Sequence, residues 1–383
     1  MVCNVSFLLQ RRASPLLTTD GVGDASKLLV ATRVIARGSP WNAARLREVQ
    51  AHLKALPHVE SVTSAAAFPA THAAEIVTKV VGDGADTQAD VVIYAGTNLI
   101  QTLQLDVVAG RSFSLQENNI TMKGCCGFSQ SGPVVISRDL ANRLFPSGHA
   151  LGKTISYQGF KGGLRTVVGI VAHLMTNRIA HAASGELEYT MLFPGVPNHW
   201  PRPVFALRGN TTDMVALRKD VASVIKHDLG GELYPASHPK VSSYSELHDA
   251  ELAGEKASVI LLSVVTLVVM LVAFIGIAAT TQSWVARRTR HIGVYRALGA
   301  RRQHILQAFQ AENLLVMGAG LLLGLVAAYG VNLWLMQYYA FPPLPWRYLP
   351  LAALGFLLWG QLAALVPALR AAKIEPMDAT RAV

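Results

Sequence analysis

The sequence predicts an α+β domain followed by an all-α membrane domain, and three observations support this. A strand-helix-strand pattern occurs near the start of the chain and again before residue 240. Three long apolar runs without charged residues occupy the last third, and a dense cluster of arginines follows the first of them. Apolar runs of about 20 residues suffice to cross a bilayer, and the basic residues beside them indicate which end stays in the cytoplasm.

The first strand-helix-strand pattern covers residues 28–64. Leu28–Ile35 alternates like a strand, Asn42 can cap a helix that Pro57 ends, and Val59–Ser64 reads as the returning strand. The expected inward face of the helix is Leu46, Val49, Leu53 and Leu56.

The same pattern recurs late in this half of the chain. Val204–Arg208 is expected as a strand, followed by a helix from about Asp213 that Gly230 and Gly231 close. Its inward face is Met214, Leu217, Val221 and Val224. Two such units predict a split β-α-β sandwich that is interrupted by an insertion.

The inserted subdomain is expected at about 106–199 and is rich in glycine and β-branched residues. Pro133–Ile136 and Thr166–Val171 read as strands, and Ser137 caps a short helix. Asn119–Gly132 has turn and loop composition.

A long helix is expected to join the two domains. Ser243 and Glu246 have capping-box spacing, so the helix starts near Tyr244. No proline or glycine pair stops it before the apolar run, and continuation to about Trp284 would make it roughly 60 Å long.

Three complete membrane helices are predicted at 257–281, 314–335 and 349–369. The first covers roughly 37 Å at a rise of about 1.5 Å per residue, which crosses a hydrocarbon core with some tilt. The third is interrupted by Gln361 and Pro367.

The connecting loops predict the orientation of these spans. Arginines gather between the first two spans, and basic residues follow the third, whereas the loop 336–348 contains only Arg347. The positive-inside bias therefore places the arginine-rich segment and the C-terminus in the cytoplasm, and the first 255 residues outside. The formal net charge of +10 reflects this topology, and no aromatic-rich basic groove indicates a nucleic-acid partner.

An outer domain of this size needs a signal or a membrane helix before it. Residues 1–12 contain only a short apolar stretch, MVCNVSFLL, ahead of two arginines. We interpret 1–12 as the outer remnant of a first membrane helix, with the outer domain at 13–243 and the stalk and membrane domain at 244–383.

Several segments resemble the FtsX/MacB-type permease family of ABC systems. RRTRHIGVYRALGARRQHI, from Arg287, and the ending PALRAAKIEPMDATRA are similar to the signature segments of the FtsX-like permease domain. LQLDVVAGRSF, VVISRDLANRLFPSGHALGKTI and TVVGIV resemble the MacB-like periplasmic core domain. The resemblance touches most of the chain.

The resemblance implies a non-catalytic permease subunit of the inner membrane. Such subunits have four membrane helices, of which the first would here be truncated, and a large periplasmic domain. They dimerise with an identical or a different permease and work with a separate ABC ATPase, which binds the ATP. A periplasmic adaptor, an outer-membrane protein and membrane lipids are further partners. The implied task is mechanotransmission for export or extraction of a peptide, antibiotic or lipid-linked substrate, and the alternative is regulation of a periplasmic cell-wall hydrolase.

The resemblance also implies that 287–299 is a coupling helix that docks on the ATPase. Its candidate residues are Arg287, Arg290, His291, Gly293, Tyr295, Arg296, Leu298 and Gly299. At helical spacing these would present cations and an aromatic ring to an acidic groove, and the alternative is binding to anionic lipid headgroups. His291 and Tyr295 stand where the family commonly has glutamate and a basic residue, so the usual salt bridge cannot be assumed.

Gly320 and Gly324 form a G-x-x-x-G pair in the second span, with Gly318 nearby. Such a pair lets two helices approach closely in lipid, either within the chain or between two copies.

No cofactor or metal is expected in this chain. Gly148–Thr154, GHALGKT, is one residue short of a phosphate-binding loop and reads as a turn into a strand at Thr154. The histidines lack ligand spacing. Cys125 and Cys126 are adjacent and could form a strained disulfide, an intermolecular bridge or a soft-metal site, or remain ordinary thiols.

Overall fold

The computed structural model describes residues 9, 13–71, 77–82, 87–124, 127, 129–157, 163–176, 186–297, 302–339, 350 and 353–363. The chain divides into two compact units. Ser14–Lys256 is an α+β unit, and Ala257–Val383 forms a helical unit together with Met1–Ala13. The predicted remnant helix 1–12 is described only at Leu9.

One half of the sheet in the α+β unit has the strand order β11-β1-β10-β2. All three neighbouring pairs are antiparallel. The strands are β1 (Leu28–Thr32), β2 (Val59–Ala65), β10 (Val204–Gly209) and β11 (Lys240–Ser243). In chain order they make two strand-helix-strand units, and the second inserts its strands next to those of the first, as in a split β-α-β arrangement.

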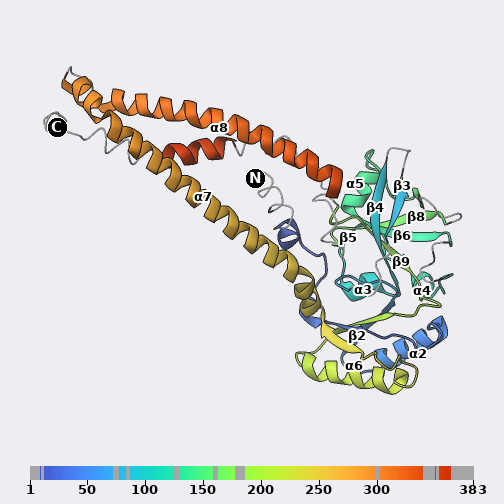
Figure 1. The fold of residues 1–383 in the computed structure, drawn as a ribbon. Coiled ribbons are helices and arrows are strands. Elements are labelled where there is room, and N and C mark those ends of the chain that lie inside the picture. Colours follow the sequence, from blue (N-terminus) through green and yellow to red (C-terminus); the bar gives the residue numbers. More distant parts are fainter. Residues whose placement is uncertain are drawn as a thin grey trace. The chain divides into compact units, whose positions relative to one another are not determined.

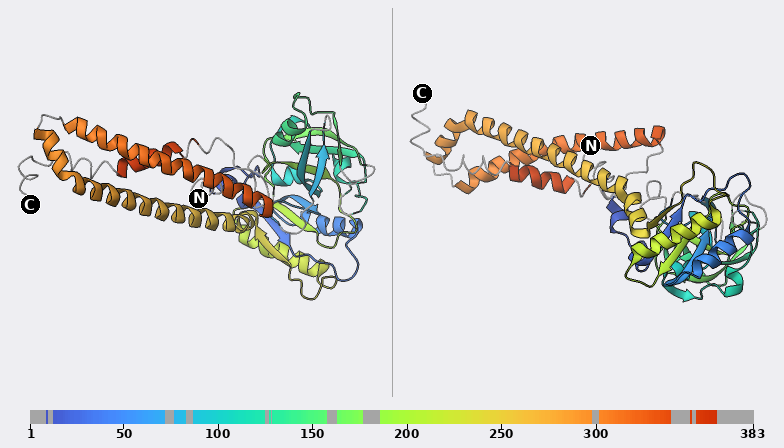
Figure 2. Two further views of the ribbon diagram at one scale, coloured as in Figure 1. Left: turned by 45° about the horizontal axis from the view of Figure 1, so that its top comes forward. Right: turned by 90° about the horizontal axis from the view of Figure 1, so that it is seen from below.

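Two amphipathic helices cover one face of this half-sheet (Figures 1 and 2). They are α2 (Ala43–Lys54) and α6 (Met214–Leu229). Asn42 and Asp213 cap them, each accepting a hydrogen bond from a backbone N–H three residues on. The predicted cap at Asn42 and the predicted start of a helix near Asp213 are confirmed. Buried side chains of both helices pack with Leu29, Phe205 and Leu207 into one cluster.

The remaining strands pair in a closed ring, β4-β3-β7-β8-β6-β9, because β9 also pairs with β4. Their bounds are β3 (Val77–Val81), β4 (Gln88–Gly96), β6 (Gly132–Ser137), β7 (Thr154–Tyr157), β8 (Arg165–Val171) and β9 (Thr190–Pro194), with β5 (Val107–Gly110) beside β8. The inserted subdomain was expected to start near Asp106, but the ring also includes β3 and β4, which come earlier in the chain. These two strands belong to the ring because they pair with β7 and β9, which lie within the expected insertion.

Three short helices lie between strands of the ring in chain order, namely α3 (Leu99–Leu103), α4 (Leu115–Asn118) and α5 (Arg138–Leu144). A further short helix, η1 (Ala25–Lys27), directly precedes β1. Ser137 caps α5 as predicted. Leu140 and Leu144 of α5 are fully buried, in the cluster that also holds Val91 and Ile93 of β4.

The helix α7 (Tyr244–Ala297) begins at a capping box. Glu246 N–H donates to the Ser243 hydroxyl at 3.2 Å, and Ser243 N–H donates to the Glu246 carboxylate at 3.4 Å. The helix does not end near Trp284, where the sequence analysis expected its end. It contains no proline, and the single glycine after Trp284, Gly293, weakens it by only about 1 kcal/mol.

The helical unit continues with α8 (Arg302–Tyr339) and the helix Ala353–Ala363. By length and apolar composition, Tyr244–Ser283 and Gln310–Trp334 could each cross a membrane. These two segments contain the predicted span 257–281 and nearly all of 314–335. The third predicted span, 349–369, is described at 350 and 353–363.

Helix Ala353–Ala363 packs against both long helices. The Trp359 ring meets Phe274 of α7 edge-on at 5.7 Å, and its Nε1 donates to the Met270 carbonyl at 3.3 Å. Gln361 Nε2 donates to the Gln310 carbonyl of α8 at 3.5 Å. The described apolar helices therefore form one bundle.

Candidate stalk and coupling site

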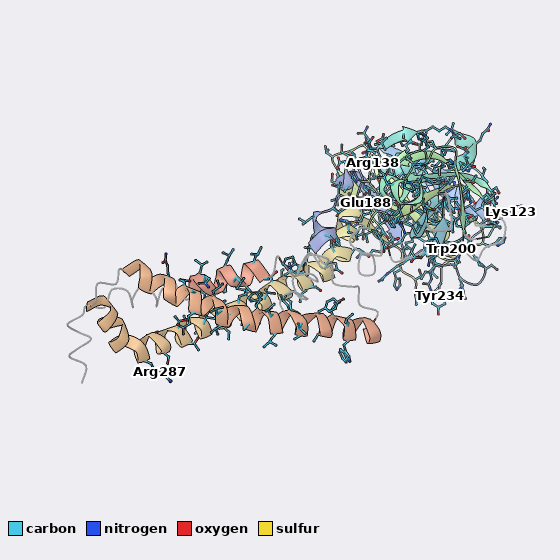
Figure 3. The ribbon with its side chains drawn as sticks, turned by 90° about the horizontal axis from the view of Figure 1, so that it is seen from above. Lys123, Arg138, Glu188, Trp200, Tyr234 and Arg287 are labelled. Atoms are coloured by element: carbon cyan, nitrogen blue, oxygen red, sulfur yellow. The ribbon has the colours of Figure 1, made fainter. Side chains whose placement is uncertain are left out.

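The arginine-rich segment continues α7 as regular helix up to Ala297. Arg287 is exposed on this helix (Figure 3). Arg290, His291, Gly293, Tyr295 and Arg296 lie on its helical backbone, while their side chains are not described. Leu298 and Gly299 lie outside the described residues, so the predicted helix end at Gly299 does too.

A cavity of about 400 Å³ lies between α7 and α8 near Arg287. Its lining is Thr280, Thr281, Ser283, Arg287, Glu312, Asn313 and Val316. The two threonine hydroxyls donate to carbonyls of their own helix, which satisfies them without a partner helix. Arg287 and Glu312 both line this cavity, a proximity that the sequence did not predict.

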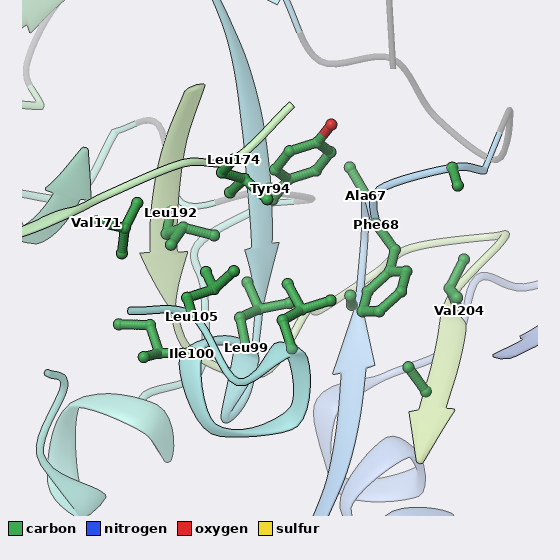
Figure 4. Close-up of a cluster of buried hydrophobic side chains, with 14 of the residues drawn as sticks. Ala67, Phe68, Tyr94, Leu99, Ile100, Leu105, Val171, Leu174, Leu192 and Val204 are labelled. Atoms are coloured by element: carbon green, nitrogen blue, oxygen red, sulfur yellow. The ribbon is translucent and has the colours of Figure 1, made fainter. Parts of the chain in front are cut away.

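The other end of α7 is anchored in the core of the α+β unit. Tyr244, the first residue of the helix, is 1% exposed and belongs to the cluster drawn in Figure 4. Its ring meets Phe68 edge-on, with centroids 6.5 Å apart and planes at 83°. On its other side it stacks on His248 at 5.9 Å. Aromatic pairs of this geometry add about 0.5–1.5 kcal/mol each to the burial of the ring.

The next turns of α7 extend this anchor. Leu247 packs against the same cluster as Tyr244, and Leu252 forms a small cluster with Met175 and Leu16. Because residues three to four apart share one helix face, the first three turns present one apolar side to the α+β unit. The capping box was visible in the sequence, but nothing local identified Tyr244 as an anchor.

The candidate glycines lie on α8. Gly318 is half-buried, and Gly320 and Gly324 are exposed. A Cβ atom built on any of the three meets no described atom within 4 Å. Among the described residues, no intramolecular helix contact therefore occupies this face.

The loop Gly148–Thr154 is a turn into β7, as predicted. Gly148 and Gly152 have left-handed backbones, with φ of 84° and 78°. The N–H groups of Gly148, Gly152 and Lys153 donate to protein carbonyls at 2.9, 2.8 and 3.2 Å. These N–H groups are thus engaged, whereas a phosphate-binding loop points them at its ligand.

Two buried arginines in the α+β unit were missed by the sequence analysis. The Arg165 guanidinium lies 4.1 Å from the centre of the Phe193 ring and donates to the Gly127 carbonyl at 2.6 Å. Burial lowers the pKa of Arg165. Arg208 is 1% exposed and donates to the carbonyls of Thr102 and Asp24, both at 2.8 Å. Both bonds join segments far apart in sequence.

Residues 18–205 match the family model of the MacB-like periplasmic core domain, and residues 263–376 match that of the FtsX-like permease C-terminal region. The chain belongs to the MacB/FtsX family of ABC transporter permeases. The arginine-rich segment lies within the permease match. Tyr244 and Leu252 lie between the two matched regions.

Bacterial relatives agree with this family. The ABC transporter permease YvrN of Bacillus subtilis is 29% identical over 65% of this chain and 61% of its own length. A macrolide export ATP-binding/permease protein MacB of Chromobacterium violaceum is 25% identical over 75% of this chain and 42% of its own. The chain thus spans less than two thirds of these relatives.

A solved structure is also similar. The extracellular domain of the transporter YknZ from Gram-positive bacteria matches 56% of this chain and 99% of that chain, at 15% identity and a TM-score of 0.37.

Among the described residues, no group of three histidine, cysteine or acidic side chains could hold a metal ion. Cys125 and Cys126 lie outside the described residues, and so does Cys3.

Proposed function

We propose that this permease converts ATP hydrolysis by a separate ATPase into movement of its outer domain. In this proposal the chain sits in the inner membrane, with the α+β unit in the periplasm and the arginine-rich segment in the cytoplasm. ATP binds the partner and not this chain. The movement serves export or extraction of a peptide, antibiotic or lipid-linked substrate, in line with the macrolide export named for MacB relatives.

The observation that carries the proposal is the continuity of α7. One helix of 54 residues begins at the buried Tyr244 and ends within the arginine-rich segment. Consecutive helical hydrogen bonds resist stretching, so displacement of one end shifts the other. To transmit movement, α7 must also be attached firmly to the α+β unit. The burial of Tyr244 and Leu252 in that unit supports such an attachment.

The coupling residues would act by docking. Arg287, Arg290 and Arg296 supply cations that suit an acidic groove on the ATPase, and Tyr295 supplies an aromatic surface. Leu298 and Gly299 would complete the contact. Binding of the same arginines to anionic lipid headgroups is the competing outcome.

Two permease subunits would complete the complex. The open face around Gly320 and Gly324 supports a close helix contact with a second copy or a related permease. A periplasmic adaptor and an outer-membrane protein would receive the movement of the outer domain.

The proposal is tested with the double variant Arg290→Glu, Arg296→Glu in the complete chain, co-expressed with its ATPase. Charge reversal should reduce co-purification of the ATPase and uncouple ATP hydrolysis from transport, while membrane insertion is unchanged. A matched control, the double variant Lys219→Glu, Lys226→Glu, places the same total charge change on exposed residues of α6. If the double variant retains both ATPase association and transport, the docking role is wrong.

A further inference from the structure

A basic cavity of about 370 Å³ lies in the α+β unit beside the first turns of α7. Its lining is Thr32, Arg33, Ile35, Ala70, Thr71, Arg202, Lys240, Leu247, Ala250 and Glu251. We propose that this cavity, built around Arg33, Arg202 and Lys240, binds a phosphate group, and that an anionic phospholipid headgroup of the outer leaflet supplies it. The proposal goes beyond ATPase coupling, and its lipid source rests on the orientation given under the proposed function, with the α+β unit outside the membrane.

The fold brings three cations together from distant parts of the sequence. Pairing of β1 with β11 sets Lys240 opposite Thr32, the residue before Arg33. The N–H of Ala36 donates to the carbonyl of Pro201 at 3.0 Å, which holds the segment of Arg202 beside that of Arg33. Backbone hydrogen bonds therefore place the segments of Arg33, Arg202 and Lys240 next to one another.

The charges at this cavity are unbalanced. Three basic residues face one acidic residue, Glu251. Among the described residues, neither an ion pair nor a side-chain hydrogen bond is found for Arg33, Arg202 or Lys240. Like charges held around one space repel each other, and an anion between them removes that cost.

The backbone at the cavity is strained at two lining residues. Arg33 and Ala70 have φ of 60° and 54°, a left-handed conformation that is unfavourable for a residue with a side chain. The hydroxyl of Ser237 donates to the Arg33 carbonyl, and Tyr234 N–H donates to the Ile35 carbonyl at 2.9 Å. Strain that the surrounding structure maintains is common at ligand sites.

The chemistry of the lining selects a phosphate ester with an apolar part. Arginine matches phosphate oxygens in a planar, bidentate geometry, and lysine adds a point charge. Ile35, Ala70 and Leu247 contribute apolar surface, which a free inorganic ion would not use. The volume is within the range of small-molecule sites and suits a headgroup rather than an acyl chain.

The position of the cavity along α7 favours a lipid headgroup as the source of the bound phosphate group. Glu251 lies six residues before Ala257, where the charge-free run begins, which is roughly 9 Å of helix rise. Headgroup phosphates are expected at about this height outside the hydrocarbon core. Because Leu247, Ala250 and Glu251 belong to the first turns of α7, a bound headgroup would contact this helix and the sheet together.

The test uses the complete chain in a nonionic detergent, titrated by calorimetry with three probes. These are a short-chain phosphatidylglycerol, glycerol 3-phosphate and inorganic phosphate. Each of the changes Arg33→Gln, Arg202→Gln and Lys240→Gln should weaken phosphatidylglycerol binding about tenfold, as expected for one charge-assisted hydrogen bond. The triple variant should abolish binding.

The matched control removes the same charge elsewhere, by Lys123→Gln, Lys219→Gln and Lys226→Gln at exposed positions, and should bind like the wild type. Glu251→Gln should strengthen binding several-fold, which a folding defect would not do. Tighter binding of phosphatidylglycerol than of the soluble phosphates supports the lipid source. Equal binding of all three supports the phosphate site but makes free phosphate its source. If the triple variant binds as the control does, or no probe binds the wild type, the proposal is wrong.

Discussion

The ring of Tyr244 stands edge-on to the ring of Phe68, with 6.5 Å between their centroids. Tyr244 starts the longest helix of the chain, and Phe68 follows the strand β2. This contact fixes the first residue of α7 to the hydrophobic core that also contains Tyr94 and Leu192 (Figure 4). A pull on the helix therefore acts on the sheet through a packed aromatic pair.

Truncation of Tyr244 should weaken this attachment. Tyr244→Ala removes a fully buried ring and should lower the free energy of unfolding by about 3–5 kcal/mol. Tyr244→Phe keeps the ring and should cost about 1 kcal/mol. Urea unfolding of the complete chain in detergent measures both. Transport that survives Tyr244→Ala unchanged in folded protein would argue against the anchor role.

Arg208 should contribute to stability through two buried carbonyls. Arg208→Met removes the side-chain donor to the Thr102 carbonyl and one of two donors to the Asp24 carbonyl, which keeps the Lys27 N–H, and should lower the free energy of unfolding by about 2 kcal/mol. Arg208→Lys can keep one bond and should cost less. The control Arg218→Met, at a partly exposed ion pair with Glu246, should change stability by about 0.5 kcal/mol or less. Equal losses at the two positions would contradict this explanation.

Glu117 should make the outer domain sensitive to acid. Hydrogen bonds from Arg111 and from the Ser114 N–H lower the pKa of the Glu117 carboxyl from 4.5 to about 2. Because the folded pKa lies below the unfolded value, the pair stabilises fully above about pH 4.5 and loses its effect as the pH falls to about 2.

The matching experiment compares the wild type with Glu117→Gln. Since the Arg111 side chain is 54% exposed, solvent screening limits the expected difference to about 1 kcal/mol at pH 7. The difference should vanish near pH 2. Unfolding curves at both pH values check this, and a difference that is independent of pH would rule out the ion pair as its origin.

The glycine face of α8 should support self-association. Gly320→Leu and Gly324→Leu fill space that is open in the single chain, so they should disrupt a dimer contact while leaving the fold intact. Gly330→Leu is the matched control, since it is exposed on the same helix but off this face. Cross-linking yield in membranes measures the effect. Unchanged dimers in both variants would assign the glycines no role between copies.

Local sequence signals predicted much of the α+β unit. The caps at Asn42 and Ser137 and the capping box at Ser243 were correct, because each depends on residues only three positions apart. The strands β1, β2, β6, β7, β8 and β10 were also predicted, whereas β3, β4, β5, β9 and β11 were not. These features depend on short-range chemistry that a single sequence displays.

Long-range pairing could not be predicted in the same way. The ring closes because β4 pairs in parallel with β9, about a hundred residues later, and no local pattern encodes that choice. The cavity around Arg33, Arg202 and Lys240 depends on the same kind of pairing. The extension of α7 beyond Trp284 was missed because the basic segment was read as a separate helix, although no helix-breaking residue precedes it.

The most direct test of the account asks which side of the membrane holds the α+β unit and which side holds the arginine-rich end of α7. Lys219→Cys and Arg287→Cys, each in a chain whose own cysteines are replaced by serine, would be treated with a membrane-impermeant maleimide in right-side-out vesicles. The account predicts labelling at position 219 in intact vesicles and at position 287 only after permeabilisation. Labelling of both positions from the same side would contradict it.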